Sequence, residues 1–187
     1  NYNLTASVRR PAFLSPQASI TVSAFSERRS EFRIYLREDI GSSIALTRES
    51  SIWRDPITLS YTFSYGRTQA TPAVFCSFFN ACTAETRSLQ EQRRPLAMLG
   101  LRAARVRVNN PVEPGRGSVY SGEAAWSSTV IGSSEFQQFT RFVAEGRWYT
   151  TLARDVVLAT RVRSGVVIGG ALSNFDVPSF IPVEQRF

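Results

Sequence analysis

Apolar and hydroxyl side chains alternate without interruption from Ile57 to Tyr65. Successive side chains of a β-strand point to opposite faces, so this pattern predicts a strand with two unlike faces. One face carries Ile57, Leu59, Tyr61, Phe63 and Tyr65, and the other carries Thr58, Ser60, Thr62 and Ser64. The apolar face must therefore lie against a protein core or against lipid.

The same alternation recurs along almost the whole chain and predicts about eight consecutive antiparallel strands. They span residues 4–14, 19–24, 32–49, 57–65, 96–108, 118–131, 136–151 and 156–170. We also expect a charged turn at Glu27–Ser30 and a long irregular segment at Thr71–Arg94. Gly41 predicts a bulge or bend in the third strand, and a break in phase predicts another bulge near Arg102–Ala104. No segment shows a helical period, so the fold class is all-β.

Three features favour a lipid-facing surface over the core of a soluble β-sandwich. Several strands reach about ten residues, the length that crosses a bilayer at a tilt, whereas typical strands have about 5–6 residues. Short turns on one side of the predicted sheet contrast with longer loops on the other. Aromatic residues lie near predicted strand ends, where a membrane barrel meets the bilayer interfaces: Trp53, Tyr61, Tyr65, Trp126 and Trp148. We therefore predict an antiparallel transmembrane β-barrel.

The composition argues against several classes of function. The 187 residues have a formal net charge of +7, and all 22 basic residues are arginine. These arginines are dispersed among apolar residues at strand spacing, whereas a nucleic-acid site gathers them into a patch. Histidine is absent, which removes the usual histidine-dependent catalytic triads and the commonest metal ligand. We expect no enzymatic activity, no cofactor, no metal site and no nucleic-acid partner.

Neither a transmembrane helix nor a signal peptide is visible in the sequence. The only methionine is Met98, so we expect the native start of the protein to be missing. The absent signal therefore says nothing about location.

Two cysteines, Cys76 and Cys82, lie close together in the irregular segment. They can close a small disulfide, which requires an oxidising compartment, or they can remain unpaired thiols. The context of a membrane barrel favours the disulfide. Two cysteines without a histidine do not make a zinc site.

The end of the chain resembles a known family. Ile181, Pro182, Arg186 and Phe187 match the segment Ile-Pro-x-x-x-Arg-Phe of the BamA/TamA superfamily of outer-membrane assembly factors. The stretch Gly122–Trp126 and the strand that ends in Arg-x-Arg-x-Gly are also similar to that family, as is Pro11–Leu14.

The resemblance implies that residues 1–187 are part of one barrel domain of about sixteen strands. Residues 171–187 would enter the large surface loop that folds back into the lumen, with Ile181, Pro182, Arg186 and Phe187 at its stem. The POTRA domains that carry partner contacts in the family are not found in this chain.

The function implied by the resemblance is assembly, insertion or translocation of proteins at the bacterial outer membrane. The barrel would open at a lateral seam and template the strands of a client protein. Expected partners are outer-membrane lipids, unfolded outer-membrane protein clients, and periplasmic or lipoprotein accessory subunits. The main alternative is a passive porin or adhesin barrel; an outer-membrane enzyme and a soluble β-sandwich binding domain are further alternatives.

Overall fold

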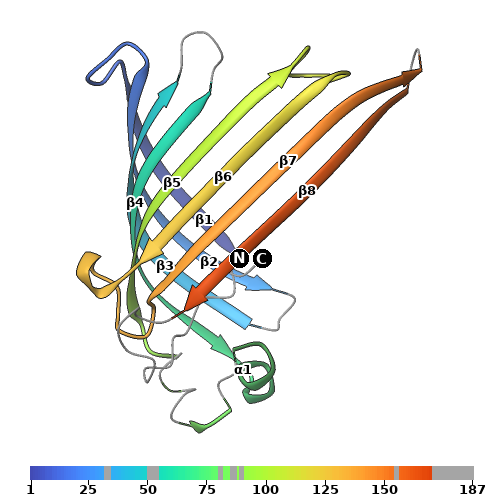
Figure 1. Ribbon diagram of the computed structural model, residues 1–187. Coiled ribbons are helices and arrows are strands. Elements are labelled where there is room, and N and C mark those ends of the chain that lie inside the picture. Colours follow the sequence, from blue (N-terminus) through green and yellow to red (C-terminus); the bar gives the residue numbers. More distant parts are fainter. Residues whose placement is uncertain are drawn as a thin grey trace.

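The computed structural model describes residues 1–31, 35–49, 55–79, 82–84, 88, 91–153 and 156–169. Within them, eight strands form one antiparallel sheet, in which each strand pairs with its neighbours in the sequence. The strands are β1 (Tyr2–Pro11), β2 (Ala18–Glu31), β3 (Tyr35–Glu49), β4 (Pro56–Ala70), β5 (Arg94–Val108), β6 (Gly117–Ser127), β7 (Phe139–Ala153) and β8 (Val156–Gly169). The sheet curves strongly and leaves β1 and β8 as open edges (Figure 1). The predicted all-β meander is confirmed.

The second strand extends further towards its C-terminal end than predicted. The predicted charged turn at Glu27–Ser30 is wrong, because β2 continues through it with Glu27 opposite Asp39 and Arg29 opposite Arg37. The alternation of faces persists across these residues. Their charge therefore reflects a strand end that leaves the apolar zone rather than a turn.

Gly41 does not form the predicted bulge. Its strand pairs with β2 and β4 without a register shift at this point. Phe25 lies directly opposite Gly41, and a Cβ atom on Gly41 would come within 2.7 Å of the Phe25 ring. The missing side chain therefore makes room for an aromatic ring on the neighbouring strand.

The predicted bulge near Arg102–Ala104 is also absent, since Arg102 pairs with Glu123 and Ala103 with Gly122 in regular register. Arg105 and Arg107 consequently share a face with Leu99 and Leu101 in β5. The only register shift in the described pairings lies between Thr151 and Ala153, where β7 turns towards β8.

The connection between β6 and β7 is longer than predicted. The strand β6 ends at Ser127, and a 3₁₀ helix, η1 (Thr129–Ile131), follows. Ser128 caps this helix by accepting a hydrogen bond from the Val130 amide at 3.4 Å, and Gly132 ends it with a φ of 108°. The β-branched residues of η1 made the segment resemble a strand in the sequence.

A short helix, α1 (Pro72–Phe79), begins the predicted irregular segment. Proline suits the first turn of a helix because the amide it lacks has no partner there. Eight residues cover little more than two helical turns, which is too short for a helical period to be recognised in the sequence.

Candidate functional site

One face of the sheet, called the outer wall here, is apolar on all eight strands. The cross-strand registers place one row of residues along it, from β1 to β6: Val8, Val22, Ile44, Tyr61, Leu99 and Trp126. These side chains are exposed, Val8 by 74% and Ile44 by 49%. A contiguous apolar surface that extends across a whole sheet is far larger than the patches that soluble monomers tolerate, and it suits lipid.

Arginines on the outer wall mark how the strands tilt. Arg10 on β1 is level with Leu46 of β3 through their common neighbour Ile20. Arg48 lies two residues further along β3, and Arg105 lies two residues beyond the level of Arg48 on β5. Each arginine thus lies two residues further along its strand than the preceding arginine, which is two strands away.

This displacement gives the strand tilt directly. Two residues rise roughly 6.6 Å and two strands span roughly 9.6 Å, so charges at equal depth require a tilt of roughly 35°. Strands of membrane barrels tilt by about 35–45°. The positions of the arginines therefore agree with a bilayer interface that crosses the strands obliquely.

Charged residues also bound the apolar surface along a single strand. The outer wall of β4 runs from Asp55, just before the strand, to Arg67 near its end. These twelve residue steps cover roughly 40 Å along the strand and roughly 30 Å along the membrane normal at this tilt. That height equals the hydrocarbon thickness of a typical bilayer.

The opposite face, called the inner wall here, is polar. Hydroxyl groups pair across its strands, as in Ser23 with Ser43 at 2.7 Å and Thr47 with Thr58 at 3.0 Å. Such pairs give each hydroxyl group a hydrogen-bond partner on the neighbouring strand, without any contact with a protein core.

Ion pairs occupy the inner wall of β6, β7 and β8. Glu145 accepts hydrogen bonds from Arg147 at 2.5 Å and from Arg161 at 2.7 Å, and Arg141 pairs with Glu123. Charged groups of both signs suit a water-filled lumen, and they would be costly on a face that contacts lipid.

The two ends of the wall differ in their connections. The turns at 12–17 and 109–116 are short and lie at one end, called the turn rim here (Figure 1). Helix α1 and the connection 128–138 between β6 and β7 lie at the other end, called the loop rim here. Outer-membrane barrels have short periplasmic turns and longer surface loops, so this asymmetry fits an oriented membrane protein.

The connection between β6 and β7 folds back over the outer wall near the loop rim. The Tyr61 hydroxyl of β4 donates a hydrogen bond to the Ile131 carbonyl at 2.9 Å. Beneath this contact, Ser133 Oγ bonds both backbone groups of Ala97, accepting from its amide at 2.8 Å and donating to its carbonyl at 2.7 Å. Ala97 is fully buried as a result. Its backbone amide and carbonyl lie beyond the end of β6, and the Ser133 side chain supplies the hydrogen bonds that a neighbouring strand would otherwise make.

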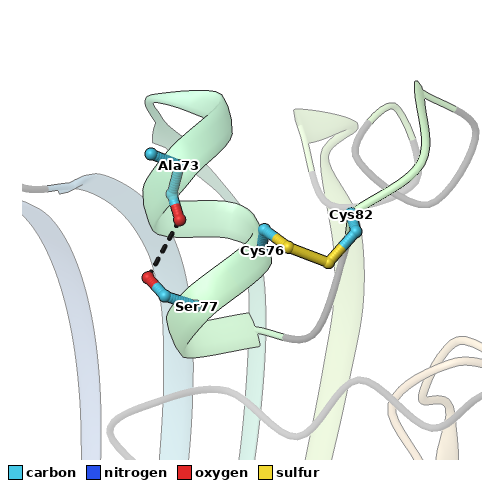
Figure 2. The surroundings of a disulfide bond; sticks show 4 residues. All are labelled: Ala73, Cys76, Ser77 and Cys82. Carbon is cyan, nitrogen blue, oxygen red and sulfur yellow. Dashed lines mark hydrogen bonds between the residues drawn. A yellow bond between two sulfur atoms is a disulfide. The ribbon is translucent and has the colours of Figure 1, made fainter.

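Cys76 and Cys82 form a disulfide between α1 and the segment that follows it (Figure 2). Within α1, the Ser77 hydroxyl donates to the Ala73 carbonyl at 2.9 Å. The bridge ties the helix to its own loop, and Cys76 and Cys82 are both exposed. Its place on the loop rim fits an oxidising compartment.

At the turn rim, Arg107 of β5 binds Asp55 with both ends of its guanidinium group, each N–O distance being 2.7 Å. The Val106 amide adds a longer hydrogen bond of 3.3 Å to the same carboxylate. These hydrogen bonds, chiefly the one from Arg107, hold the pKa of Asp55 below its ordinary value. The carboxylate therefore ties the start of β4 to the end of β5.

Several predicted residues lie outside the part of the chain that the structure describes: Trp53, Ile181, Pro182, Arg186 and Phe187. Among the described residues, no group of three or more potential metal ligands occurs. The helices in this part of the chain are all too short or too polar to span a membrane.

Sequence reasoning missed two features of the outer wall. The Trp148 indole donates to the Tyr120 hydroxyl at 2.9 Å, with the rings 5.7 Å apart in an edge-to-face arrangement. A cluster of arginines around Glu38 was missed because Arg28 was assigned to a turn. The absence of glycine and proline between Ser26 and Ser30 was the signal that could have revealed it.

Comparison with known proteins identifies the family. A sequence model of the Omp85 superfamily domain matches residues 1–181, and no curated protein matches the chain. The match covers nearly all of the sequence and confirms the resemblance to the BamA/TamA superfamily. Members of this group are outer-membrane proteins of bacteria that act in protein assembly and transport. With its tilted, two-faced sheet, the chain belongs to the Omp85 superfamily.

Proposed function

We propose that this chain forms part of the barrel of a factor that inserts proteins into the bacterial outer membrane or translocates them across it. The membership of the Omp85 superfamily carries this proposal. The barrel acts by opening a lateral seam, where an exposed strand edge pairs with a strand of the client. Its partners are membrane lipids, unfolded outer-membrane protein clients and accessory subunits.

The outer wall supports a role in thinning the bilayer. On β7, seven successive outward positions carry no charge: Thr140, Phe142, Ala144, Gly146, Trp148, Thr150 and Leu152. On β3, only four lie between Glu38 and Arg48: Ile40, Ser42, Ile44 and Leu46. Lipids adapt to a shorter apolar surface by thinning. A bilayer that thins along the wall lowers the barrier that a client strand must cross.

A passive porin is the second candidate, and the polar inner wall with its ion pairs around Glu145 favours it. The soluble β-sandwich has no such support, because a sandwich needs two facing sheets and the described strands form one.

Reconstitution of the full-length protein into liposomes tests the proposal. An unfolded outer-membrane protein is added, and its folding is followed by the shift in electrophoretic mobility of unheated samples. We expect folding several-fold faster than in empty liposomes or in liposomes that contain an ordinary porin of similar size.

Equal rates in all three preparations would contradict the proposal, and a steady ion conductance without assembly activity would favour the porin. The gene offers an independent check. We expect POTRA repeats upstream of the barrel and a Val-Arg-Gly sequence soon after Phe187.

A further inference from the structure

Three arginines converge on one carboxylate at the loop rim of the outer wall. Glu38 of β3 lies opposite Arg28 of β2 and Arg67 of β4 in the register of the sheet. The Arg67 Nε donates to Glu38 at 2.9 Å, and Arg28 and Arg93 each approach the carboxylate to 3.5 Å. These four residues are called the Glu38 cluster here.

The Glu38 cluster has more positive than negative charge. Three guanidinium groups and one carboxylate leave a net charge of +2. The nearest acidic residue along the strand, Asp39, points to the inner wall and pairs there with Arg37. The side chains of Arg28 and Arg93 are 49% and 52% exposed, whereas that of Glu38 is 21% exposed. The carboxylate thus orients the arginines while their positive charge faces outwards.

The depth of the Glu38 cluster matches that of lipid headgroups. Arg28, Glu38 and Arg67 lie two residues beyond the row that contains Ile40 and Tyr65. That distance is roughly 6.6 Å along the strand and roughly 5 Å along the membrane normal. Tyrosines of a barrel mark the level of the interface. Because a register row crosses the membrane normal obliquely at this tilt, Arg28 lies near the level of Tyr65 and Arg67 lies roughly 5 Å beyond it, so the cluster spans the region where phosphate groups are found.

We propose that the Glu38 cluster binds the phosphate of a lipid headgroup in the membrane leaflet at the loop rim. Guanidinium groups bind phosphate oxygens in pairs, and several of them at one site match a phosphomonoester, whose charge is close to −2. The acyl chains of the same lipid would lie on the apolar surface that begins at Ile40 and Tyr65. The site goes beyond assembly activity and requires only that the outer wall faces a membrane.

Lipid binding to the full-length protein in a neutral detergent tests the proposal. The protein is titrated with phosphatidic acid, and bound lipid is counted by native mass spectrometry, with phosphatidylcholine as the comparison lipid. We expect phosphatidic acid to bind more tightly, and the Arg28→Gln/Arg93→Gln variant to lose about tenfold in affinity. This variant keeps the Arg67–Glu38 hydrogen bond.

The matched control is Arg10→Gln/Arg48→Gln, which removes the same charge from the outer wall at the turn rim. We expect it to retain phosphatidic acid binding within about twofold. If the Arg28→Gln/Arg93→Gln variant fails to fold, Arg93→Gln is tested alone, because Arg93 lies just before β5 and outside the sheet. We expect this variant to lose affinity while the control does not.

Three results would overturn the proposal: equal losses in the variant and in its control, equal affinity for the two lipids, or displacement of phosphatidic acid by inorganic phosphate at similar concentration. The last result would show a site for a free anion. Client folding is measured separately, so a failure here is distinguishable from a failure of the proposed function.

Discussion

At the scale of single residues, polar side chains hold this wall together at its rims. Asp55 and Arg107 join β4 to β5 at the turn rim, and Ser133 closes the edge of β5 at the loop rim. Both interactions satisfy groups at strand ends, where regular pairing stops. Neither could be predicted from the sequence, because the partners are separated by 52 and 36 residues respectively, and alternation reports only which face a residue occupies.

The pairing of Asp55 predicts a pH dependence of stability. Because the folded state holds the pKa of Asp55 below its unfolded value, the carboxylate stabilises the fold above about pH 4, and this contribution is lost as the pH falls through the lower, folded-state pKa. We expect Asp55→Asn to be less stable than the wild type at pH 7, with the difference shrinking as the pH falls through the lowered pKa of Asp55. Urea unfolding across this pH range measures it. A difference independent of pH would contradict the assignment.

Ser133→Ala is expected to destabilise the loop rim. The substitution leaves the buried Ala97 amide without its partner, which costs about 1–3 kcal/mol. Hydrogen exchange at the Ala97 amide should accelerate, and the free energy of unfolding should fall. Ser134→Ala is the control, because Ser134 bonds β5 through its backbone amide. If both variants exchange alike, the Ser133 side chain is not what holds the loop.

At the scale of elements, alternation predicted the eight strands and the two faces, but it failed where a strand changes environment. β2 carries Glu27, Arg28 and Arg29 beyond its apolar part and still pairs regularly, so charge was a misleading sign of a turn. Residues 128–138 show the opposite error, because Val130 and Ile131 are apolar and β-branched yet lie outside any strand. Composition describes what surrounds a segment, whereas pairing with a neighbour decides its conformation.

The uneven height of the outer wall makes a prediction for β1 and β3. Arg10→Leu/Arg48→Leu extends their apolar surface at the turn rim and should reduce thinning of the bilayer there. We expect client folding to slow several-fold while the barrel itself stays folded. Ser164→Leu on β8, where the apolar surface is already long, is the control. Unchanged folding rates in the Arg10→Leu/Arg48→Leu variant would argue that thinning on this side does not contribute.

At the scale of the whole molecule, the two faces define a wall between lipid and water. Adjacent residues of β5 test this assignment, since Leu99 lies on the outer wall and Met98 on the inner wall. We expect Leu99→Arg to destabilise the folded barrel by about 2–4 kcal/mol, the cost of an arginine near the bilayer midplane, and Met98→Arg to cost much less. Urea titration of folding in liposomes measures both. Equal costs would contradict the assignment of the faces.

The stepwise displacement of Arg10, Arg48 and Arg105 also sets how wide the complete barrel must be. One residue of offset per strand, repeated over about sixteen strands, gives a backbone cylinder of roughly 15 Å radius. Side chains cannot fill an interior of that width. Left empty, it would let large antibiotics and detergents pass through the cell envelope. A barrel of this width therefore needs a stopper if it is not to act as an open pore, and cells that carry such a barrel without one should become sensitive to these compounds.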